Sequence, residues 1–103
     1  MSGKTTNGRS KPAGPPALVM RLYVSSGANS VQAVANLAAI CDEYLKDAFK
    51  LEVIDVLENP LRALTDGIVV TPSLAKISPS PAARIVGNLS DKSGVLQALG
   101  IKG

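Results

Sequence analysis

Short apolar runs alternate with turn residues from residue 18 onward, and this alternation predicts four strands. The runs are rich in Val, Leu and Ile, and turn residues such as Gly, Pro, Asn and Ser separate them, as is typical of strands. The second run also alternates charged with apolar residues over its first half, which indicates one solvated face. The predicted strands are residues 18–24, 49–57, 73–77 and 83–86.

Apolar residues spaced three and four apart predict a helix between the first two strands. Asn29 or Ser30 is its expected N-cap, because both residue types accept a hydrogen bond from the first free backbone N–H groups. The pattern predicts one apolar face on this helix, made of Val31, Val34, Ala35, Ala38, Cys41 and Leu45.

Two shorter helices have clear start and stop signals. Asn59-Pro60 predicts a helix start, with the Asn59 amide as cap, and Gly67 suits the left-handed residue that ends the helix. The last helix is expected to be capped within residues 89–91 and to end at Gly100. Its apolar face is Val95, Leu96 and Leu99.

The resulting order is β-α-β-α-β-β-α, which predicts a thioredoxin-like α/β fold with a mixed sheet. A strand-helix-strand crossover implies a parallel first pair, and the hairpin over residues 73–86 adds an antiparallel pair. A proline before the third strand, at Thr71-Pro72, is usual in such folds. The loop at 25–29 carries no cysteine, however, so the redox chemistry of the fold is not expected there.

Composition excludes several classes of chemistry. The chain has no histidine, which removes Ser-His-Asp and Cys-His catalysis together with histidine-based metal sites. Its one cysteine, Cys41, allows no internal disulfide and no Cys-x-x-Cys pair. A thioredoxin-like redox enzyme that uses Cys41 stays an alternative, but nothing near it in sequence would lower the thiol pKa.

The positive charge is concentrated in the first sixteen residues, where Lys4, Arg9 and Lys11 have no acidic neighbour. Residues 1–16 are rich in Gly, Ser and Pro and are expected to form a disordered tail, while 17–103 form one domain with balanced charge. Nucleic-acid binding is not expected, because the sequence shows no cluster of basic residues with aromatic residues between them. No transmembrane-length run or signal peptide is present, so a cytoplasmic protein without a membrane partner is expected.

Five segments in the same order and spacing resemble the KaiB family of circadian clock proteins: 21–24, 29–31, 51–60, 71–76 and 84–90. The resemblance implies a regulator that is not an enzyme and needs no cofactor or metal. Its implied partner is the ring of the hexameric KaiC ATPase, whose KaiA-stimulated phosphorylation KaiB opposes. KaiB also competes with the related sensor domain of a histidine kinase, so a sensor-type domain that docks on such a kinase is an alternative.

The resemblance also implies a metamorphic protein. One fold is a βαββααβ ground state that forms homo-oligomers, a dimer or tetramer, and the other is a thioredoxin-like monomer that binds KaiC. The switch repacks the chain after Asn59, and the prolines of the central segment are implied in it, Pro72, Pro79 and Pro81.

Three departures from the family pattern suggest a divergent or non-cyanobacterial relative. Ala98 and Gly100 stand where many relatives have Gly and Asp; Ala favours a helix over Gly by roughly 1 kcal/mol, and Gly suits the helix end. Both changes therefore favour the thioredoxin-like state. The family's triple-proline turn is reduced to Pro79-Ser80-Pro81, and an acidic C-terminal extension is missing.

Four charged residues are implied as the partner-binding surface by the same resemblance. They lie on the second strand and the short helix after it: Lys50, Glu52, Asp55 and Arg62. Judged without the resemblance, they are ordinary solvated surface charges, which usually contribute little.

Overall fold

A four-stranded mixed sheet forms the centre of the computed structural model, which describes residues 18–101. The strand order is β2-β1-β3-β4, with β1 (Leu18–Val24) parallel to β2 (Phe49–Asp55). Strand β3 (Ser73–Ser78) runs antiparallel to both β1 and β4 (Ala83–Val86). The predicted crossover, hairpin and thioredoxin-like fold are confirmed. The predicted tail at 1–16 lies outside the described residues, as do the first residue and the last two residues of the predicted domain 17–103.

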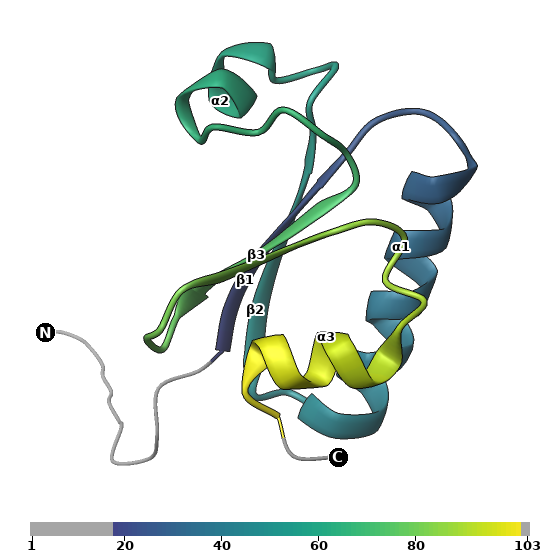
Figure 1. Cartoon of the computed structure of the whole chain (residues 1–103), viewed down its shortest axis with the longest axis vertical. Helices are drawn as coiled ribbons and strands as arrows, with labels where there is room; N and C mark the ends of the chain where they lie inside the picture. Colours follow the sequence, from purple (N-terminus) through teal and green to yellow (C-terminus); the bar gives the residue numbers. More distant parts are fainter. Residues whose placement is uncertain (1–17, 102–103) are drawn as a thin grey trace, which may run out of the picture.

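Helices α1 (Ala28–Ile40) and α3 (Lys92–Leu99) cover the same face of the sheet, as Figure 1 shows. A π-helical turn, η1 (Cys41–Leu45), continues α1 and was not predicted from the sequence. Because side chains alternate along a strand, every second residue of β1 points to this face. The main core therefore joins Met20 and Leu22 of the sheet to buried residues of both helices, among them Leu37, Ile40, Val95, Leu96 and Leu99.

The predicted apolar face of α1 is wrong over most of its length. Val31 and Val34 are exposed, as are Ala35 and Ala38, and of the predicted stripe only Cys41 is buried. Leu37 and Ile40 instead point to the sheet, with Ala33 between them and the helix start. The helix carries two apolar stripes, and the one with the larger side chains removes more apolar surface from water when it packs.

The predicted cap of α1 is also wrong. The helix begins at Ala28, after Gly27, whose φ of 120° is open to glycine but rarely to other residues. Ser30 lies inside the first turn, and its Oγ accepts a hydrogen bond from the Ser25 N–H at 3.0 Å. Ser30 therefore holds the loop before the helix.

The two shorter helices start and end close to the predicted residues. Helix α2 (Pro60–Thr65) follows Asn59, but the Asn59 side chain donates to the Asp55 carbonyl at 3.0 Å and makes no cap. Asp91 caps α3 by accepting from the Gly94 N–H at 3.2 Å. Gly67 and Gly100 both have the positive φ expected of residues that end a helix, 73° and 75°.

Within residues 18–101, a small apolar cluster covers one end of the second face of the sheet. Tyr23, Ile54 and Ala75 form a small buried cluster there, against which Val56 and Ile68 pack. Helix α2 lies at this end of the sheet, beyond the strand ends (Figure 1). The segment after β2 therefore forms a separate feature at one end of the molecule.

Candidate functional site

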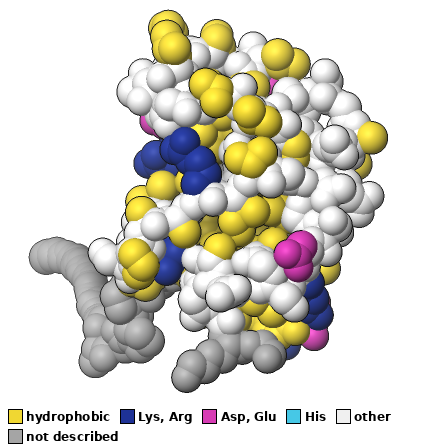
Figure 2. Space-filling view, in the orientation of Figure 1, with side chains coloured by type: hydrophobic (Ala, Val, Ile, Leu, Met, Phe, Trp, Pro, Cys, Tyr) yellow, Lys and Arg dark blue, Asp and Glu magenta, His cyan; other side chains and the backbone are white. Residues whose placement is uncertain are grey.

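An exposed group of large apolar side chains surrounds α2 and forms what we call the apolar crest: Leu57, Leu61, Leu64, Val69 and Val70. The exposed fractions of Leu61, Leu64 and Val69 are 78%, 77% and 93%. Figure 2 shows hydrophobic side chains gathered over the α2 end of the molecule. Contiguous exposed apolar surface in a small domain commonly marks a protein interaction site.

The local sequence explains why the crest faces outward. Pro60 fixes the first helical position, and Gly67 ends α2 after less than two turns. Ala63 is the buried residue of α2, and its carbonyl accepts from the Ile68 N–H at 2.9 Å, which turns the chain back towards β3. A helix this short has room for one inward side chain, so its leucines remain in solvent.

A shallow hollow of about 290 Å³ opens beside the crest. Its lining is mainly apolar and comes from the end of β2, from α2 and from the loop that leads to β3: Val56, Pro60, Ala63, Leu64, Ile68, Val69 and Thr71. The hollow and the leucine and valine side chains at its rim could together accommodate a protruding apolar side chain of a partner.

Two of the predicted partner-binding residues, Glu52 and Arg62, form an ion pair with each other. Arg62 donates from both terminal nitrogens to the Glu52 carboxylate, at 2.6 and 2.7 Å. These hydrogen bonds lower the pKa of Glu52, and they raise the pKa of Arg62. The pair links β2 to α2 in a bidentate geometry, which holds the helix in one orientation.

A second carboxylate, Asp66, extends this contact into a polar network beneath the crest. The Tyr23 hydroxyl donates to Asp66 Oδ2 at 2.7 Å, and nitrogens of Arg21 and Arg62 each lie 3.7 Å from the same oxygen. Burial, followed by the hydrogen bond to Asp66, raises the pKa of Tyr23. We call these residues the polar network: Arg21, Tyr23, Glu52, Arg62 and Asp66. It joins β1 and β2 to α2 and to the residue that follows this helix.

The other two predicted residues are placed differently. Asp55 Oδ1 accepts from the Leu57 N–H at 2.8 Å, so its carboxylate shapes the turn between β2 and α2. Lys50 is exposed near the start of β2 and makes no ion pair within residues 18–101. The structure therefore groups Glu52, Arg62 and Asp55 around α2 and leaves Lys50 further along the strand.

The chain's family follows from comparison with known proteins. The KaiB domain model matches residues 21–101, which include all the elements after the start of β1. This chain belongs to the KaiB family. Over 85 residues it is 46% identical to the circadian clock protein KaiB3 of Synechocystis, covering 82% of this chain and 83% of that protein. The circadian clock oscillator protein KaiB of Microcystis aeruginosa is 45% identical over 79% of each chain.

Solved structures place this KaiB-family chain among thioredoxin-like folds. The N-terminal domain of Synechococcus elongatus SasA superposes with a TM-score of 0.69 at 27% identity, over 90% of this chain and 92% of that domain. Chloroplastic thioredoxin z superposes with a TM-score of 0.64 at 20% identity, over 81% and 80% of the two chains. The second likeness concerns the fold alone.

The residues that the KaiB resemblance implies in fold switching lie in two regions. Pro72 is buried just before β3, while Pro79 and Pro81 are exposed in the β3–β4 turn, and the peptide bond before each is cis. Ala98 lies within the last turn of α3, and Gly100 follows that helix. A role for them in switching stays a prediction.

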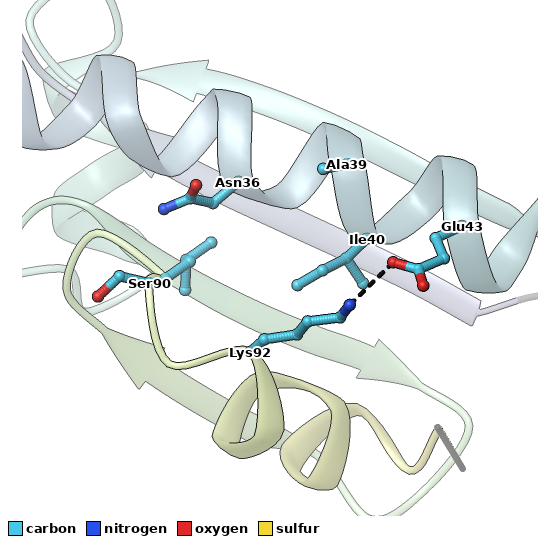
Figure 3. A pocket seen from close by; sticks show the side chains of 7 residues that line it. Asn36, Ala39, Ile40, Glu43, Ser90 and Lys92 are labelled. Atoms are coloured by element: carbon cyan, nitrogen blue, oxygen red, sulfur yellow. Dashed lines mark hydrogen bonds and ion pairs between the residues drawn. The ribbon is translucent and has the colours of Figure 1, made fainter.

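A second hollow, of about 230 Å³, lies between α1 and the chain that enters α3 (Figure 3). Lys92 Nζ and Glu43 Oε1 lie 2.9 Å apart across it, and the ammonium is 5.0 Å from the centre of the Tyr44 ring. This pair ties the start of α3 to η1. Within residues 18–101 there is no metal-binding group of three or more His, Cys, Asp or Glu, and no helix is long and apolar enough to span a membrane.

Cys41, the candidate redox residue, lies in the main core. Its exposed fraction is 4%, and burial raises the pKa of its thiol, whereas a reactive cysteine needs an accessible thiolate. We expect a disulfide reagent to modify Cys41 about a hundredfold more slowly in the native protein than in denaturant at the same pH, because reaction requires opening of the core. Stopped-flow absorbance measures both rates. Equal rates would contradict this burial and revive the redox hypothesis.

Proposed function

We propose that this chain is a non-catalytic clock-type regulator that docks on the ATPase ring of a KaiC-like hexamer through the apolar crest. Membership in the KaiB family supports the class of function. The observation that carries the docking surface is the exposure of Leu61, Leu64 and Val69 on a short helix. The partner identity rests on the family resemblance.

The crest, more than the predicted charges, accounts for affinity in this proposal. Burying one exposed leucine side chain against a partner contributes about 1.5–3 kcal/mol to the free energy of binding. Glu52 and Arg62 already pair with each other, so a partner's charge would have to compete with an existing bidentate contact. Their contribution is to hold α2 in place before binding, which reduces the ordering cost of association.

The test is binding of the full chain to a nucleotide-loaded KaiC-type ATPase from the same cell, measured by fluorescence anisotropy. Leu61→Ser combined with Leu64→Ser is expected to weaken binding by about thirtyfold or more, as for hot-spot residues. Val31→Ser is the matched control, because Val31 is also highly exposed but lies on α1. Wild-type affinity in the double variant would refute the crest as the docking surface.

The family resemblance also supports a second, βαββααβ arrangement of the same chain that assembles into a dimer or tetramer. Ala98 and Gly100 favour the helical form of the last element, so we expect the thioredoxin-like monomer to be well populated before the partner binds. Light scattering behind a sizing column, over a range of concentrations, detects the oligomer. A monomer at every concentration would remove this part of the proposal.

Docking on a histidine kinase is the second candidate function. It is favoured by the superposition on the SasA N-terminal domain, which extends over nearly the whole of both chains. The two candidates share the crest and differ in partner. Binding to a sensor kinase from the same cell, together with no binding to the ATPase after hours of incubation, would favour the kinase.

A further inference from the structure

Lys76 is a charged residue inside the domain. Its exposed fraction is 6%, and it lies on β3 opposite Met20 of β1 and Ala83 of β4. Because strand residues alternate, its side chain shares a face with Leu74, which belongs to the main core. Lysines are almost never so buried unless their charge has a partner. Within residues 18–101 no carboxylate forms an ion pair with it.

The ammonium of Lys76 lies at the C-terminal end of α3. A Cβ atom placed on Gly100 would be 3.5 Å from Lys76 Nζ. Gly100 ends the helix in the left-handed conformation, where its N–H donates to the Gln97 carbonyl at 3.1 Å. The Ile101 N–H donates back to the Leu96 carbonyl at 2.8 Å, which closes the turn around the same point.

This end of α3 attracts a cation. The aligned peptide dipoles of a helix place partial negative charge on its last carbonyls, and the effect is strongest where water is excluded. Helix α3 has no basic residue of its own in the last turn. Lys76 brings the missing charge from strand β3, and its buried side chain starts from the side of the sheet that faces the main core.

We propose that Lys76 is a positioning residue that fastens the C-terminal end of α3 to the sheet through its charge. The helical form of residues 92–99 then provides the electrostatic partner that the buried ammonium needs. A different backbone path over residues 96–101 would remove that partner. Because the ammonium lies beside Gly100, a charged side chain introduced at that position would change how strongly the lysine holds this end of the helix. This role of Lys76 is independent of docking through the crest.

The first experiment compares amide hydrogen exchange by NMR in three variants of the full chain. Lys76→Met keeps the stem but removes the charge, and is expected to speed exchange at residues 98–101 by about tenfold relative to α1. Lys76→Arg keeps the charge and should stay within about threefold of wild type. Lys46→Met removes an exposed charge and serves as the control. If amide exchange at residues 98–101 is equally fast in Lys76→Met and Lys46→Met, the proposal fails.

The second experiment keeps Lys76 and changes its neighbour, so that it remains informative if Lys76→Met does not fold. Gly100→Asp and Gly100→Asn differ by one charge, and both residue types tolerate the left-handed conformation. The helix end repels a carboxylate at position 100, whereas the Lys76 ammonium attracts it. The aspartate variant is expected to protect the end of α3 about fivefold more than the asparagine variant, because the full charge of the ammonium outweighs the roughly half-unit charge of the helix end. Equal protection in the two Gly100 variants would overturn the proposal. A chain shortened to end at Ile101 is a further control: if Lys76→Met no longer changes exchange in it, the proposal also fails.

Discussion

Replacing Leu37 with alanine is expected to lower the free energy of unfolding by about 2–5 kcal/mol, because it opens a cavity in a packed core. Leu37 is fully buried between α1 and the sheet. Urea denaturation followed by circular dichroism measures the loss. The matched control is Val31→Ala on the same helix, which should be neutral or slightly stabilising, since Val31 is exposed and alanine favours a helix.

The pair of variants also tests which face of α1 packs on the sheet. The spacing of apolar residues alone predicts that Val31 lies in the core. In the structure Val31 is exposed, and Leu37 is the residue of α1 that is buried in the core. A loss of several kcal/mol for Val31→Ala with little change for Leu37→Ala would mean that the helix is rotated about its axis relative to this description.

Replacing Asp66 with alanine is expected to destabilise the domain by about 1–3 kcal/mol, because the hydroxyl of the buried Tyr23 loses its hydrogen-bond acceptor. Asp66→Asn keeps an acceptor and removes the charge, so it should cost less. A double-mutant cycle with Tyr23→Phe isolates the coupling between the two side chains. If the two single losses simply add, Asp66 and Tyr23 do not act together.

Titration of Tyr23 provides an independent readout of the same contact. Asp66 raises the pKa of Tyr23, so the pKa should fall towards the ordinary value in Asp66→Asn, while burial keeps part of the shift. Because the folded pKa lies above the unfolded value of 10.0, this group stabilises the fold below that pH. The stabilisation is lost as the pH rises through the folded pKa. NMR of the tyrosine rings separates Tyr23 from Tyr44, and an unchanged pKa in Asp66→Asn would contradict the proposed cause.

Strand positions could be predicted from the sequence because turn residues limit them. The predicted 83–86 strand matches β4, and the predicted 73–77 strand is one residue shorter than β3. The ends of β3 and β4 are limited by the proline and glycine residues that flank them: Pro72, Pro79, Pro81 and Gly87. By contrast, the orientation of α1 depends on which of its two apolar stripes meets the sheet, and that choice is made by packing between elements that are distant in sequence.

The proposed docking surface could be predicted only in part. The predicted charged residues lie on β2 and α2, close to the crest, but their mutual pairing depends on how α2 folds back onto β2. The crest was missed because Leu61 and Leu64 look like core residues in a sequence. One signal was available: a helix bounded by Pro60 and Gly67 is too short to bury two leucines as well as Ala63.

The ends of the described domain lie far from the crest. The start of β1 and the end of α3 both lie at the end of the sheet opposite α2 (Figure 1). An affinity tag, a fluorescent protein or a surface tether attached beyond either end would therefore leave the crest exposed. The same layout suits a modular protein, because a domain built this way can be joined in tandem to a catalytic or membrane module and still present its leucines to a partner.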